Sequence, residues 1–138
     1  MVRKREAFRN RETILVVEDT YDVRKMICQI LEHHGYTVLE AANGVEALEI
    51  SGAYCKNIHL VLTDVIMPRM NGRELAEHIR RTMPSTRLIF MSGFTDDPMV
   101  NPIGDLPVFL PKPFTPVALT NKIREVLDRH LEDSDQTS

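Results

Sequence analysis

The sequence predicts an α/β fold in which helices cover both faces of a parallel sheet, and three observations support this prediction. Short apolar runs alternate with segments whose apolar residues recur at helical spacing. The alternation occurs five times within 138 residues, a length that suits one domain. Polar residues able to carry chemistry directly follow four of the runs, as expected at the ligand-binding edge of such a sheet.

Each predicted strand is an apolar run that is too short for a helix and is bounded by turn-forming residues. The first is rich in β-branched residues, which favours a buried strand. The fourth ends on Ser92-Gly93, and the fifth is a run of only three residues. In chain order, the predicted strands are 13–17, 37–41, 59–63, 87–91 and 108–110.

The predicted helices carry apolar residues on one face, and local signals mark their ends. Gly35 ends the first, Met83-Pro84 ends the third, and Thr115 before Pro116 starts the last. The predicted helices are 21–33, 45–50, 73–82 and 115–130. Residues 94–107 contain three prolines, so we expect only a short or irregular fourth helix there.

The two ends of the chain lack the patterns of regular structure. Residues 1–11 are charged and show no apolar periodicity, so we expect a flexible basic lead-in. Residues 132–138 are expected to form a disordered tail. The predicted folded domain therefore covers residues 12–131.

The composition restricts the classes of function. Hydrophobic residues make up 43% and charged residues 27%, and the formal net charge of -3 gives no reason to expect a nucleic-acid partner. No apolar stretch is long enough to span a membrane, and no apolar segment of the kind a signal peptide needs follows the charged start. Cys28 and Cys55 lack paired spacing and favour a reducing compartment, so we expect the cytoplasm.

The topology predicts where the polar residues meet. Right-handed crossovers and the common strand order 2-1-3-4-5 give a flavodoxin-like, doubly wound sheet with its first and third strands side by side. The carboxyl ends of parallel strands share one edge. We therefore expect five side chains to converge at that edge: Glu18, Asp19, Asp64, Ser92 and Lys112.

The residue types at this edge indicate phosphoryl chemistry with a divalent cation. Three clustered acids repel one another unless a cation offsets their charge, and oxygen ligands suit Mg²⁺, with Mn²⁺ as the expected substitute. A lysine and a hydroxyl beside them suit an incoming phosphoryl group. The ordinary alternatives are an Asp64 that caps a turn and a Glu18-Asp19 pair that caps the following helix.

Four motifs at predicted strand ends resemble those of the receiver domains of bacterial two-component response regulators. The resemblance covers residues 12–130. The motifs are Val16-Val17-Glu18-Asp19, Asp64-Val65-Ile66-Met67-Pro68 with Asn71-Gly72, Met91-Ser92-Gly93, and Lys112-Pro113-Phe114.

The resemblance implies that Asp64 is the phosphoacceptor, taking a phosphoryl group from a histidine of a partner kinase or phosphotransfer domain. It implies Mg²⁺ held by Asp64, by Asp19 directly, by Glu18 through a water, and by the backbone carbonyl of Ile66. It also implies a signalling module that assists its own phosphorylation and dephosphorylation, and not an enzyme.

The resemblance also implies that the remaining motif residues transmit the effect of phosphorylation to the surface. Lys112 would pair with the phosphoryl oxygens, Ser92 would move to bond them, and Phe109 lies at the aromatic switch position. Family members often have a cis bond before the proline of the Lys112-Pro113 pair. Ile66 and Phe94 stand where family members often have polar residues, so we expect a long-lived phosphorylated state.

Other interpretations stay open. The opening 11–17 and Met91-Ser92-Gly93-Phe94 resemble receivers at the carboxyl end of hybrid histidine kinases, and the short tail predicts a stand-alone receiver or one cut from a larger protein. A receiver-like module could bind a protein without phosphorylation. An aspartyl-phosphate phosphatase of the haloacid dehalogenase type would carry a second acid two residues after the nucleophile, where this chain has Ile66.

Overall fold

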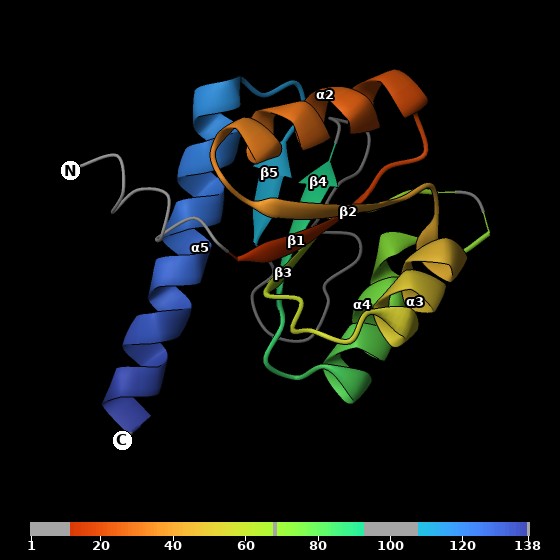
Figure 1. Ribbon diagram of the computed structural model, residues 1–138. Coiled ribbons are helices and arrows are strands. Elements are labelled where there is room, and N and C mark those ends of the chain that lie inside the picture. The colour runs from red at the N-terminus through yellow and green to blue at the C-terminus, as the bar shows by residue number, and fades with distance from the viewer. Residues whose placement is uncertain (1–11, 68, 93–107, 138) are drawn as a thin grey trace.

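A computed structural model describes residues 12–67, 69–92 and 108–137. These residues form one five-stranded parallel sheet with the strand order β2-β1-β3-β4-β5 (Figure 1). The strands are β1 Thr13–Val17, β2 Thr37–Ala41, β3 Leu60–Asp64, β4 Arg87–Ser92 and β5 Phe109–Pro111. The helices are α2 Tyr21–His33, α3 Gly44–Ala53, α4 Gly72–Thr82 and α5 Pro116–Thr137.

Helices cover both faces of the sheet because successive side chains of a strand point to opposite faces (Figure 1). Ile14 and Val16 of β1 pack in one core with residues of α2 and α5. Leu15 and Val17 pack in the other core with residues of α3 and α4. All five residues of β1 and of β3 are buried, so the two strands that end at the acids are the centre of the fold.

The predicted fold class and strand order are confirmed, and the bounds of three elements match the prediction: β1, α2 and β2. Gly35, with a φ of 95°, follows α2 as expected. The strand predicted over 59–63 instead spans Leu60–Asp64, so Asp64 belongs to β3 itself. The predicted lead-in at 1–11 and the irregular helix at 94–107 lie outside the described residues.

The last helix is longer than predicted. It starts near Thr115, whose hydroxyl oxygen accepts the Ala118 N–H at 3.0 Å, but it runs to Thr137 and not to His130. The helix therefore includes the backbone of residues 132–137, which belong to the segment predicted as a tail. No glycine or proline interrupts this stretch, and no local signal stops the helix earlier. Within the described part of the chain, no helix has the length and apolarity needed to cross a membrane.

Gly72 fixes the turn that follows β3. Its N–H donates to the carbonyl of Val65 at 2.8 Å, and a Cβ at this position would overlap the backbone carbonyl oxygen of Asp64. Asn71 caps α4 from the same turn, accepting the Glu74 N–H at 2.9 Å, while Glu74 accepts the Asn71 N–H at 3.2 Å. The end of β3 is thus held against the start of α4.

We expect Gly72→Ala to lower the free energy of unfolding by about 1–3 kcal/mol, because the added methyl group must displace the backbone of Asp64. Gly52→Ala is the matched control. A Cβ at Gly52 meets no described atom within 4 Å, and alanine in α3 should stabilise the protein by about 0.5–1 kcal/mol. Urea unfolding measures both changes, and a Gly72→Ala variant as stable as the parent would contradict this account of the turn.

Candidate functional site

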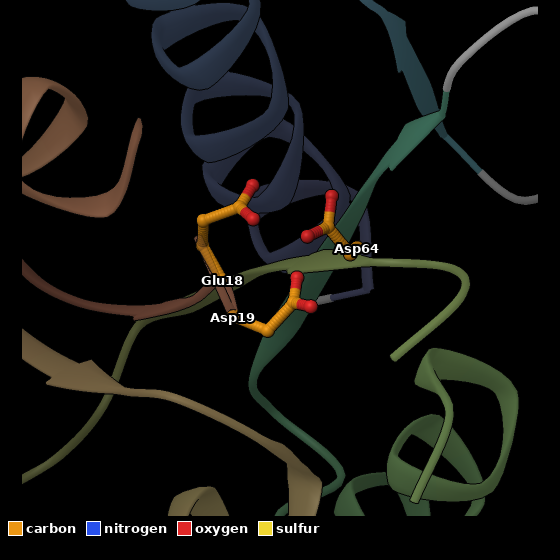
Figure 2. Close-up of side chains that lie close together, drawn as sticks. All are labelled: Glu18, Asp19 and Asp64. Atoms are coloured by element: carbon orange, nitrogen blue, oxygen red, sulfur yellow. The ribbon is translucent and has the colours of Figure 1, made fainter. Parts of the chain in front are cut away.

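The acidic residues meet because β1 and β3 are neighbours in the sheet. Val17 is in register with Thr63, so the residues that follow, Glu18 and Asp64, lie side by side at the carboxyl edge. Each of Glu18, Asp19 and Asp64 offers a carboxylate oxygen, and these oxygens all lie within 4.8 Å of one another (Figure 2). Glu18 and Asp64 are buried, whereas Asp19 is exposed.

Lys112 places one ammonium between the two buried acids. Its Nζ lies 2.6 Å from Asp64 Oδ1 and 2.9 Å from Glu18 Oε1. The bond between Lys112 and Pro113 is cis, as expected for the motif. The Lys112 N–H donates to the carbonyl of Ser92 at 2.8 Å, which joins the end of β5 to the end of β4. The structure therefore brings four of the five predicted side chains, from three strand ends, into one cluster: Glu18, Asp19, Asp64 and Lys112.

Ser92, the fifth, is buried and lies one residue beyond the position in register with Asp64, which is Met91. Phe109 lies apart from the acids and packs its ring against Phe90, with 5.6 Å between the ring centroids. Ile66, two residues after Asp64, is 64% exposed.

Three further hydrogen bonds hold Glu18 by its side chain and its backbone. The Thr20 N–H donates to Glu18 Oε2 at 3.0 Å, and the Glu18 N–H donates to the carbonyl of Ala41 on β2 at 3.1 Å. Arg24 Nη1 donates to the Glu18 carbonyl at 2.8 Å. Sequence reasoning missed Arg24, because an arginine in an amphipathic helix ordinarily indicates a solvated face.

Glu18 does contact the start of α2, so the capping alternative is right in part. Thr20 is the N-cap residue, but its own side chain makes no capping hydrogen bond. Figure 2 shows, however, that the Asp19 and Asp64 carboxylates face the same space as Glu18. Capping alone does not account for this arrangement of three acids.

Burial and mutual repulsion change how the two buried acids ionise. Burial raises the pKa of Asp64 to about 7, the Glu18 carboxylate adds to this rise, and Lys112 opposes it. Burial also disfavours ionised Glu18, but hydrogen bonds from Asp64, the Thr20 N–H and Lys112 outweigh it and lower the pKa of Glu18. The pKa of Lys112 is raised, because its bonds to Asp64 and Glu18 outweigh its own burial.

The donor set fits a hard divalent cation. All three clustered groups offer carboxylate oxygens, the ligands that Mg²⁺ prefers, and none is a sulfur or imidazole ligand that would favour zinc. Two of the acids are buried and repel each other, so a cation that binds them removes an unfavourable interaction. This is the acidic pocket typical of receiver domains that accept phosphoryl groups.

Comparison with known proteins identifies relatives along most of the chain. Residues 14–124 match the family model described as the response regulator receiver domain. The chain is 36% identical over 117 residues to the response regulator receiver protein CpdR of Brucella abortus, covering 83% of this chain and 95% of CpdR. It is 40% identical over 122 residues to the sensor kinase CckA of the same organism, covering 85% of this chain but only 13% of that kinase.

Solved structures agree with the sequence comparison. The crystal structure of the receiver domain from the hybrid histidine kinase CckA matches with a TM-score of 0.72 and 33% identity, covering 83% of this chain and 98% of that one. A response regulator receiver domain protein from Clostridium thermocellum matches with a TM-score of 0.76 and 28% identity, covering 86% and 95%.

The raised pKa of Asp64 predicts that Asp64→Asn stabilises the protein in EDTA at pH 8. Between about pH 4 and pH 7 the folded Asp64 keeps a proton that the unfolded chain has lost, so its contribution to stability falls as pH rises through this window. Asparagine cannot ionise, and we expect a gain of about 1–3 kcal/mol at pH 8 that shrinks toward pH 5.

Urea unfolding in EDTA at several pH values measures this effect, with Asp19→Asn as the control. Asp19 is exposed, so its replacement should change the free energy of unfolding by less than about 0.5 kcal/mol. An Asp64→Asn variant that is less stable than the parent at pH 8, or a gain that grows toward pH 5, would contradict the electrostatic account.

Proposed function

The chain belongs to the response regulator receiver domain family, and we propose that it accepts a phosphoryl group on Asp64 from a phosphorylated histidine of a partner protein. The partner is a histidine kinase or a histidine phosphotransfer domain. The observation that carries the proposal is the contact of Lys112 Nζ with Asp64 Oδ1 at 2.6 Å, inside a cluster of three acids.

The reaction needs a nucleophile, and Asp64 has the environment for one. A carboxylate oxygen of Asp64 forms a bond to phosphorus while the phosphorus–nitrogen bond to the partner's imidazole breaks. The electron pair of that bond leaves on the imidazole nitrogen, which takes up a proton. Because a carboxylate is a weak nucleophile, its placement beside a fixed positive charge is the main help that the protein gives.

The chain's own groups stabilise the transferred group from two sides. Lys112 lies beside the acceptor carboxylate and can move with the new phosphoryl oxygens. Glu18, Asp19, Asp64 and the backbone carbonyl of Ile66 would hold Mg²⁺. When bound, Mg²⁺ offsets the negative charge of the transferring phosphoryl group. Mn²⁺ should replace it, since it accepts the same oxygen ligands.

The product would change the surface through Ser92 and Phe109. Phosphorylation brings about −1.5 to −2 charge and three acceptor oxygens to the carboxyl edge. Ser92 is buried next to that edge, and Lys112 is tied to it by a backbone bond of 2.8 Å. A shift of Ser92 and Lys112 toward the phosphoryl group would therefore move β4 and β5 together, and with them Phe109.

Relatives of two architectures match this chain. The match covers 95% of CpdR, whereas in CckA the matched part is only 13% of a long kinase. Either arrangement fits a receiver that signals through protein contacts with no nucleic-acid partner of its own. We propose that it acts in the cytoplasm as a signalling module and not as an enzyme with turnover.

Intact mass after incubation with Mg²⁺ and acetyl phosphate tests the proposal. We expect the parent to gain one phosphoryl group, and Asp64→Asn or a sample in EDTA to gain none. Asp22→Asn is the matched control, because Asp22 lies in the first turn of α2 outside the cluster, and this variant should be labelled like the parent.

No gain in the parent under any of these conditions would contradict the proposal and favour a phosphorylation-independent binding module. Steady hydrolysis of a phosphate ester that survives Asp64→Asn would favour a phosphatase. The expected long life of the phosphorylated state stays a prediction. Of the two apolar residues on which this prediction rests, Ile66 is exposed and Phe94 lies outside the described residues. Loss of the label within seconds would show it to be wrong.

A further inference from the structure

We propose that Arg24 is a positioning residue that holds the Glu18–Asp19 backbone in the conformation needed for cation binding. The inference rests on the function proposed above, because it concerns the same site. Arg24 itself contributes no ligand atom. It acts through the backbone of the two residues that carry the carboxylates.

Arg24 joins three parts of the chain. Its Nη1 donates to the carbonyl of Glu18 at 2.8 Å, and its Nε donates to Glu40 Oε1 on β2 at 2.9 Å. Its own N–H donates to the carbonyl of Thr20 at 2.9 Å. The side chain of Arg24, only 13% exposed, therefore ties the Glu18 end of the loop between β1 and α2 to the neighbouring strand β2, whereas the bond to Thr20 is a backbone bond of the first turn of α2.

The Glu18 carbonyl determines where Asp19 lies. A peptide unit is planar, so a carbonyl held in place also sets the position of the following nitrogen and Cα. The Glu18 N–H is held as well, by the carbonyl of Ala41 at 3.1 Å. Asp19 is exposed, so backbone placement, more than side-chain packing, directs its carboxylate toward the cluster (Figure 2).

The adjacent Lys25 contacts the same two side chains as Arg24, those of Glu40 and Tyr21. Lys25 Nζ donates to Glu40 Oε2 at 2.7 Å. Both side chains lie over the Tyr21 ring, with the cation 5.4 Å from the ring centroid for Arg24 and 5.6 Å for Lys25. Two features distinguish Arg24: its bond to the Glu18 carbonyl and its deeper burial, with 13% of the side chain exposed against 41% for Lys25. Lys25 therefore serves as the control for loss of the contacts with Glu40 and Tyr21.

The proposal and simple electrostatics predict changes of opposite sign. Removing a positive charge near three acids should strengthen the binding of a cation, because the repulsion between side chain and ion disappears. Removing a group that orients the ligands should weaken it, and the loss of such groups typically costs about 10- to 100-fold in metal affinity. The direction of the change therefore separates a positioning role from a role as a nearby charge.

Titration of the full chain with Mg²⁺, followed by NMR chemical shifts, tests the inference. We expect Arg24→Met to bind Mg²⁺ about tenfold more weakly than the parent. Lys25→Met should bind within about twofold of the parent, or slightly more tightly, since its charge is partly screened. Dispersed amide signals in EDTA establish that each variant is folded.

Two further measurements keep the test decisive. Arg24→Lys retains the charge but lacks the planar fork that reaches two acceptors, so its Mg²⁺ affinity should also fall. This variant replaces Arg24→Met if Arg24→Met does not fold.

The second measurement is labelling with acetyl phosphate, in which the Mg²⁺ concentration for half-maximal labelling should rise in the Arg24 variants. Their labelling rate at saturating Mg²⁺ should stay within about twofold of the parent.

Unchanged or tighter Mg²⁺ binding by folded Arg24 variants would overturn the inference, and so would equal losses in Arg24→Met and Lys25→Met. In both cases the parent still binds Mg²⁺, and the proposed function stands. If the parent itself binds no Mg²⁺, the proposed function fails and this inference fails with it.

Discussion

The site depends on one interaction, in which the Lys112 ammonium lies between the buried carboxyl groups of Glu18 and Asp64. Two acids this close to each other and away from water cannot both ionise easily, which is why the pKa of Asp64 rises to about 7. Because a single lysine offsets only part of the negative charge of the two acids, they can also bind a divalent cation. The same lysine then lies beside the group that would receive phosphate.

The fold makes this arrangement possible by placing two acids at the ends of adjacent central strands. β1 and β3 are buried along their whole length, so their ends can shift little. The close approach of Gly72 holds the backbone of Asp64 at the end of β3. The bond from Arg24 to the Glu18 carbonyl holds the backbone of Glu18 after β1. The rigid scaffold offsets the cost of keeping like charges together, as is common at functional sites.

Much of the fold and of the site followed from local patterns in the sequence. Buried strands are continuous apolar runs, and the polar residue after each run, such as Asp64 or Lys112, marks the edge where strands converge. The bond of Arg24 to the Glu18 carbonyl was not predictable, because it depends on which side chains tertiary structure brings together. The end of α5 was missed because residues 131–137 are mostly polar and charged, a composition that resembles a disordered tail, although they contain no helix breaker.

Thermal unfolding of Lys112→Met, in EDTA and in Mg²⁺, tests most directly whether lysine and cation satisfy the same two carboxylates. The account predicts a lower unfolding temperature than the parent in EDTA, because two buried acids then lack a positive partner. It also predicts that Mg²⁺ raises the unfolding temperature of the variant by more than that of the parent, since the cation replaces the missing ammonium. A variant as stable as the parent in EDTA, or one whose stability does not respond to Mg²⁺, would contradict it.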